Sequence, residues 1–125
     1  MIRTAIIGAA GRMGRMLVTL TLNDPELKLA GAIEIPECPF LGQDAGVVAG
    51  QKPSGVTITS SLEAIIGQVD AIIDFSAPEN TMQTAALAAR HNVALVVGTT
   101  GLSDAQRAEM KRLAAGGARL VQAPN

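Results

Sequence analysis

Short apolar runs alternate along the chain with segments in which apolar residues recur at helical spacing. The runs predict buried strands, and the other segments predict helices that pack on a sheet. The predicted strands are residues 2–7, 28–33, 56–59, 69–75, 93–97 and 119–121. The predicted helices are residues 11–22, 78–90 and 104–115, with a small one that contains Leu62, Ile65 and Ile66. This alternation predicts an α/β fold with a doubly wound parallel sheet, the Rossmann-like architecture of dinucleotide-binding domains.

Residues at the ends of the predicted helices support these boundaries. Asn23-Asp24-Pro25 stops the first helix, because proline cannot continue a helix. Pro78 suits the first turn of the next long helix, and Ser103 is placed to cap the last one. Ser60 or Ser61 can cap the small helix in the same way.

A long connection rich in glycine and proline, residues 34–55, interrupts the alternation. A short helical turn is predicted within it, near residues 43–48. A structureless connection of this length is unusual in a compact domain. It either covers a ligand or makes a plain excursion over the surface, and the sequence favours neither interpretation.

The first predicted strand leads through a glycine-rich turn, residues 8–14, into the first helix. This is the context in which a dinucleotide fingerprint is meaningful. Gly8 lets the chain turn, Gly11 leaves room for a pyrophosphate, and Gly14 lets the helix pack close to the strand. The helix directs free N–H groups and a partial positive charge at the phosphates. Because the spacing is G-x-x-G-x-x-G and not G-x-G-x-x-G, a glycine turn that binds no nucleotide is the alternative.

An acidic residue is expected roughly twenty residues after such a turn, at the end of the second strand. Glu34 stands there, directly after the apolar run that ends at Ile33. Its carboxylate can accept hydrogen bonds from the hydroxyls of the adenosine ribose. Arg12 could reach a phosphate or the adenosine end, or it could be an ordinary solvated arginine.

Ligands of doubly wound sheets lie beyond the carboxyl ends of the strands, which makes residues 74–78 and 98–101 further candidates. Thr99 and Thr100 in the second segment could bond a nicotinamide amide or ribose. The alternative for this segment is an ordinary strand-to-helix turn that leads to the cap at Ser103. Asp70 and Asp74 flank a buried strand and do not form a paired-carboxylate site.

Composition narrows the function classes. Hydrophobic residues make up 48% and charged residues 17% of the 125, which suits one α/β domain with a sheet covered on both faces. The net charge of −1 and an aromatic content of two Phe argue against nucleic acid, and the strand-length apolar runs argue against a membrane. The single cysteine, Cys38, cannot form an internal disulfide, which fits a cytoplasmic protein without a signal peptide. The chain shows no His/Cys cluster, so we expect no metal site.

None of the candidate residues is a convincing acid, base or nucleophile. The only histidine, His91, comes at the end of a predicted helix, where a cation suits the helix dipole. We therefore expect no catalytic residue in this chain. It finishes with Ala123-Pro124-Asn125 after a short strand. We expect residues 1–125 to be an N-terminal NAD(P)-binding domain without its C-terminal substrate and catalytic domain.

Five segments in order resemble the N-terminal domain of the 4-hydroxy-tetrahydrodipicolinate reductase family, also called dihydrodipicolinate reductase. They are residues 8–14, 42–46, 74–79, 97–101 and 123–125. Each segment is modest alone, but the ordered set at family-like spacing is specific. The resemblance extends over essentially the whole chain.

The resemblance implies an oxidoreductase that uses NADH or NADPH to form tetrahydrodipicolinate in diaminopimelate and lysine biosynthesis. It implies that the pyrophosphate is held by Gly8, Ala9, Ala10, Gly11, Arg12 and Met13, and the adenosine ribose by Glu34. The other cofactor contacts that it implies are Phe75, Ser76, Gly98, Thr99, Thr100, Ala123, Pro124 and Asn125, with Thr100 also near the substrate. The family's catalytic histidine and lysine lie in a C-terminal domain, through which a homotetramer forms.

One departure from the family bears on the choice of cofactor. Many members follow the ribose-binding acid with a basic residue that can meet a 2′-phosphate, whereas Ile35 and Pro36 follow Glu34 here, which favours NADH. Two other functions stay open: the NAD(P)-binding domain of a related amino-acid dehydrogenase, and an NAD-sensing module without chemistry. Sequence beyond Asn125 would separate the two enzymes, and the chain has no basic helix with which a sensor could bind DNA.

Overall fold

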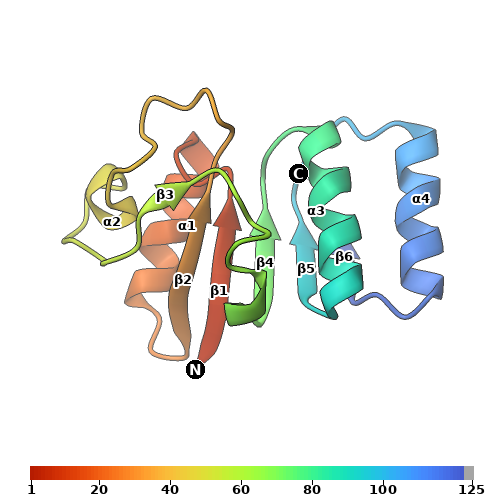
Figure 1. Ribbon diagram of the computed structural model, residues 1–125, viewed down its shortest axis with the longest axis horizontal. Coiled ribbons are helices and arrows are strands. Elements are labelled where there is room, and N and C mark those ends of the chain that lie inside the picture. The colour runs from red at the N-terminus through yellow and green to blue at the C-terminus, as the bar shows by residue number, and fades with distance from the viewer. Residues whose placement is uncertain (123–125) are drawn as a thin grey trace.

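Six strands form one parallel sheet in the order β3-β2-β1-β4-β5-β6 (Figure 1). The computed structural model describes residues 1–122. The strands are β1 (Ile2–Ile7), β2 (Leu27–Ile33), β3 (Ile58–Thr59), β4 (Ala71–Asp74), β5 (Ala94–Val97) and β6 (Leu120–Gln122). The helices are α1 (Arg12–Asn23), α2 (Ala45–Val48), the 3-10 helix η1 (Ile66–Gln68), α3 (Pro78–His91) and α4 (Asp104–Ala115). The strand order reverses between β1 and β4, so the predicted doubly wound sheet is confirmed, with its switch point between these strands.

The helix ends follow the predicted chemistry. Ser103 accepts a hydrogen bond from the backbone N–H of Gln106, whose side chain bonds the backbone N–H of Ser103 in return. Pro78 occupies the first turn of α3, and α1 ends at Asn23 before Asp24 and Pro25. Within residues 1–122, none of the helices has the length and hydrophobicity needed to cross a bilayer.

Four predicted elements are shorter than expected, one of them by a single residue, because the strand predicted over residues 93–97 begins at Ala94. The strand predicted over residues 56–59 is only Ile58–Thr59, because the carbonyl of Val56 accepts the N–H of Ala45 in the preceding connection. The small helix is reduced to the 3-10 turn η1, and Ser61 accepts a hydrogen bond from Ala64 in the turn before it. The strand predicted over residues 69–75 is Ala71–Asp74, since the N–H of Val69 still bonds the carbonyl of Ile66 in η1 and the chain turns away after Asp74.

The two faces of the sheet have separate apolar cores. Ile6 points to one face and packs with Val18 of α1, whereas Ile7 points to the other, where Ala85 and Ala88 of α3 are buried. Met110 of α4 belongs to the second core as well. Alternating residues of β1 therefore contact the helices on both faces of the sheet. Because the strands are parallel, the carboxyl ends of β1, β2, β4 and β5 lie at one edge.

One carboxylate orders the long connection over residues 34–55. Asp44 caps α2 by accepting hydrogen bonds from the N–H groups of Gly46 and Val47. It also accepts bonds from the backbone N–H groups of Ser54 and Gly55, at 2.9 and 2.8 Å. The pKa of Asp44 is lowered to about 2, chiefly by the hydrogen bond from the Ser54 N–H. The connection is therefore a defined loop around Asp44.

Candidate functional site

The glycine turn after β1 has the close contacts that a dinucleotide fingerprint requires. Gly8 has φ +84°, and a Cβ there would lie 2.6 Å from the carbonyl oxygen of Phe75. A Cβ on Gly14 would lie 1.9 Å from the carbonyl oxygen of Gly8, so only glycine lets α1 approach the turn this closely. Gly11 is the N-cap of α1 and is exposed. A Cβ at Gly11 would lie 3.3 Å from the carbonyl oxygen of Gly8. Backbone atoms thus pack closely around Gly8 and Gly14, whereas Gly11 is exposed to solvent.

Glu34 is joined directly to this turn. Its Oε2 accepts a hydrogen bond from the backbone N–H of Ala10 at 2.9 Å, and its Oε1 accepts one from the N–H of Ile35 at 3.1 Å. The sequence spacing placed Glu34 at the end of β2, and the structure brings it beside the fingerprint turn. The bond to Ala10 is a further role that the spacing does not reveal.

A second cluster of predicted site residues lies where β4 and β5 end. A Cβ on Gly98 would lie 2.0 Å from the ring of Phe75, so the end of this ring packs against the backbone of Gly98. The N–H of Ser76 donates to Oγ1 of Thr99 at 3.0 Å, and the N–H of Gly98 donates to the carbonyl of Asp74 at 2.8 Å. Residues 74–76 and 98–99 are therefore one hydrogen-bonded unit.

The two neighbouring threonines of this cluster differ. Thr99 is buried, and its hydroxyl contacts Ser76, the hydroxyl of Thr81 and the carbonyl of Asp74. Thr100 is exposed and lines a small cavity of about 190 Å³ with Gln122 and Arg107. The Thr100 side chain is thus exposed to solvent, whereas the Thr99 hydroxyl is hydrogen-bonded within the protein.

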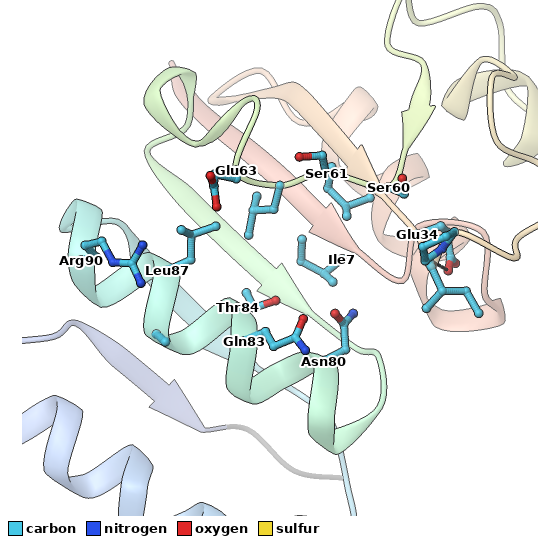
Figure 2. Close-up of a pocket in the computed structure, with 15 residues that line it drawn as sticks. Ile7, Glu34, Ser60, Ser61, Glu63, Asn80, Gln83, Thr84, Leu87 and Arg90 are labelled. Carbon is cyan, nitrogen blue, oxygen red and sulfur yellow. Dashed lines mark hydrogen bonds between the residues drawn. The ribbon is translucent and has the colours of Figure 1, made fainter.

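A groove of about 500 Å³ runs from Glu34 along α3 (Figure 2). Asn80 and Gln83 follow the helix on one side, and Ser60 and Ser61 lie on the opposite side. The groove also has apolar surface from Ile7, Ile33, Ile35, Pro36, Leu62 and Leu87. Neither Asn80 nor Gln83 was predicted from the sequence as a site residue, although both are polar residues near the start of a helix that follows a candidate strand end.

Asp74 is a charged residue in an otherwise apolar position. It is 0% exposed at the carboxyl end of β4, and its Oδ1 accepts a hydrogen bond from Oγ of Ser76 at 2.5 Å. Burial raises the pKa of Asp74, and the hydrogen bond from Ser76 opposes this effect.

The candidate site therefore combines an exposed glycine at a helix N-terminus, a carboxylate acceptor, a groove beside α3 and an exposed threonine. His91 is exposed in the last turn of α3, at the far end of that helix from Asn80. In the part of the chain that the structure describes, no group of three or more His, Cys, Asp or Glu side chains is arranged to hold a metal. Ala123, Pro124 and Asn125 lie outside the described residues.

Comparison with known proteins gives one consistent match. Residues 2–125 match the family model for the N-terminus of dihydrodipicolinate reductase. A 4-hydroxy-tetrahydrodipicolinate reductase of Burkholderia lata is 49% identical over 123 residues, which are 98% of this chain and 46% of that protein. The chain thus spans less than half the length of this relative.

Solved structures agree with this match. The dipicolinate-bound dihydrodipicolinate reductase from Paenisporosarcina sp. TG-14 superimposes with a TM-score of 0.78 and 28% identity, over 100% of this chain and 48% of that one. An amine dehydrogenase from Mycobacterium smegmatis, 23% identical, has a TM-score of 0.73 over 95% of this chain and 38% of that one. The second similarity shows a shared fold only.

Proposed function

Because this chain belongs to the dihydrodipicolinate reductase family, we propose that it is the cofactor-binding part of an NAD(P)H-dependent reductase. The proposed substrate is 4-hydroxy-tetrahydrodipicolinate, which is reduced to tetrahydrodipicolinate in diaminopimelate and lysine biosynthesis. The observation that carries the proposal is the 2.9 Å hydrogen bond between Glu34 and Ala10, because it joins a ribose-binding carboxylate to a pyrophosphate-binding turn. A single dinucleotide can contact both.

The pyrophosphate would lie over Gly11, against the N-terminus of α1. The first-turn N–H groups and the partial positive charge of the helix favour two phosphates there. Arg12 is exposed in this turn, where its guanidinium can add a charged donor. Ala9, Ala10 and Met13 would contribute backbone contacts.

The adenosine end would enter the groove beside α3. Glu34 would accept hydrogen bonds from the ribose hydroxyls, while Ile35 and Pro36 give the adenine an apolar wall. The side-chain amides of Asn80 and Gln83 can donate to and accept from the polar edge of the base.

The nicotinamide end would lie at the cluster formed by the ends of β4 and β5, beside Phe75, Ser76 and Gly98. When bound, the reduced cofactor supplies a hydride, and the chain's own residues orient it. Thr100 would face the substrate with its free hydroxyl, and Thr99 would make any cofactor contact through its backbone. Ala123, Pro124 and Asn125 are proposed to complete the cleft.

The proposed cofactor preference is NADH at least as much as NADPH. A 2′-phosphate would approach the Glu34 carboxylate, and Ile35 and Pro36 give no positive charge beside it. The proton donors for the reduction, and the contacts for a homotetramer, are proposed to lie in the part of the relatives that this chain does not span. We propose the cytoplasm as the location, and we propose no nucleic acid or membrane partner.

Isothermal titration of the full-length protein with NADH tests this function. Gly11→Val should weaken NADH binding by roughly tenfold or more, because a side chain would fill the space proposed for the pyrophosphate. Gly67→Val is the matched control, since a Cβ at Gly67 has nothing within 4 Å and the residue lies in η1. Equal NADH affinity for the wild type and Gly11→Val would count against the proposed site.

A further inference from the structure

We infer that Asp74 is a positioning residue, which holds the nicotinamide end of the proposed cofactor site in place through Ser76. This inference rests on the proposed function. The Asp74 side chain is fully buried and cannot contact a bound ligand directly, so it acts through the turn that follows it.

The position of Asp74 in the sheet is unfavourable for a carboxylate. On β4 it follows Ile72 at a spacing of two, so both side chains point to the apolar core that contains Leu95 and Val97. Its Oδ2 is a fully buried atom with no hydrogen-bond partner among residues 1–122. Burying a carboxylate oxygen without a hydrogen bond costs free energy, so the presence of Asp74 in the core needs an explanation.

The contacts of Asp74 supply that explanation. Its side chain accepts the hydroxyl of Ser76 at 2.5 Å, and its carbonyl accepts the N–H of Gly98 at 2.8 Å. The N–H of Ser76 in turn donates to Oγ1 of Thr99, which also accepts the hydroxyl of Thr81 at 2.8 Å. The Asp74 side chain therefore holds Ser76, and the N–H of Ser76 together with the Asp74 carbonyl joins the turn after β4 to the turn after β5.

This link reaches the nicotinamide end and not the adenosine end. Phe75 lies between Asp74 and Ser76, with its carbonyl beside Gly8 and its ring against Gly98. Loss of the Asp74–Ser76 bond would shift residues 75 and 76. Glu34 is held by separate bonds at the end of β2, so it would stay in place.

The test compares two ligands on the full-length protein. NADH contains both ends of the cofactor, and ADP-ribose has the adenosine and pyrophosphate but no nicotinamide. Titration calorimetry gives the Kd of each ligand for the wild type, Asp74→Ala, Asp74→Asn and Ser76→Ala. Asp70→Asn is the matched control, since Asp70 lies just before β4, is exposed and pairs with Arg3. Thermal melting without ligand monitors folding.

Asp74→Ala should weaken NADH by roughly tenfold and leave ADP-ribose within about twofold, because only the nicotinamide contacts are misplaced. Asp74→Asn keeps an acceptor for the Ser76 hydroxyl and should recover most of the NADH affinity. Ser76→Ala should reproduce the loss, and the double variant Asp74→Ala/Ser76→Ala should lose no more than either single variant. Asp70→Asn should bind both ligands like the wild type.

Equal losses for both ligands in Asp74→Ala, or no loss for either, would overturn the positioning role. If Asp74→Ala does not fold, Asp74→Asn and Ser76→Ala decide the outcome, and unchanged NADH affinity in Ser76→Ala overturns it. A wild-type protein that binds neither ligand would overturn the proposed function together with this inference. A wild type that binds both ligands and an Asp74→Ala variant that keeps their affinity ratio would overturn only the inference.

Discussion

The choice between NADH and NADPH should depend on Glu34, and two substitutions in the full-length enzyme separate its two roles. Glu34→Gln removes the charge but keeps the size of the side chain and one acceptor oxygen. Glu34→Ala also removes the bond that ties the end of β2 to the N–H of Ala10 at 2.9 Å. We expect Glu34→Gln to change the cofactor preference, and Glu34→Ala to weaken both cofactors.

The magnitude follows from the geometry at Glu34. Backbone N–H groups occupy one acceptor position on each carboxylate oxygen, and the remaining positions can accept the two ribose hydroxyls. Each hydrogen bond to a charged acceptor contributes about 1.5–3 kcal/mol. A 2′-phosphate about 4 Å from the carboxylate meets a repulsion of ~4 kcal/mol per charge pair before screening by salt. Because two backbone bonds hold the carboxylate in place, it cannot easily turn away from that phosphate.

The assay is the ratio of kcat/KM for NADH to kcat/KM for NADPH. The wild type should use NADH at least as well as NADPH, and Glu34→Gln should shift the ratio toward NADPH by roughly tenfold, or about 1.4 kcal/mol. Ile35→Arg should raise NADPH use through a new cation beside the phosphate. A wild-type preference for NADPH above about tenfold, or an unchanged ratio in Glu34→Gln, would refute this reasoning.

Three further predictions concern stability and activity. Gly14→Ala should destabilise the fold by about 3 kcal/mol, measured by urea denaturation, since its Cβ would lie 1.9 Å from the Gly8 oxygen, and Gly67→Ala is the open-space control. Asp44 and Asp70 both have a pKa lowered to about 2, so the stability that their charged forms contribute above pH ~4 should be lost as the pH falls toward 2. Acid titrations followed by circular dichroism should show a smaller loss of stability in Asp44→Asn than in the wild type. Residues 1–125 alone should not oxidise NADH in the presence of the substrate, and detectable loss of NADH absorbance would contradict this.

Features that depend on the spacing of residues close together in the chain were predictable from the sequence. The glycines of the turn, the acid at the end of β2 and the caps of the helices depend on neighbours a few residues away or on one strand–helix–strand unit. Gly8, Gly14 and Glu34 lie accordingly where the pattern placed them, and the sheet is parallel and doubly wound as predicted.

Features that depend on contacts between distant segments were not predictable in the same way. Thr99 and Thr100 are neighbours with similar side chains, but only the structure shows that one hydroxyl is bonded internally and the other is exposed. The hydrogen bonds of Asp44 to residues 54 and 55 likewise form only when the loop closes. Asp74 did leave a signal, as a charged residue ending an apolar run, but its partner Ser76 becomes clear only from the geometry.

The packing of Phe75 on Gly98 also constrains how this fold can change over evolutionary time. The two residues share one volume, since the ring occupies the space that a Cβ on residue 98 would need. A side chain at position 98 therefore requires the Phe75 ring to turn away or position 75 to hold a smaller residue, so the size accepted at position 98 depends on position 75. Among sequences with this architecture, the sizes at the two positions should be inversely correlated. An ancestor that exchanged this aromatic ring for a smaller side chain would have gained freedom to vary the turn after β5.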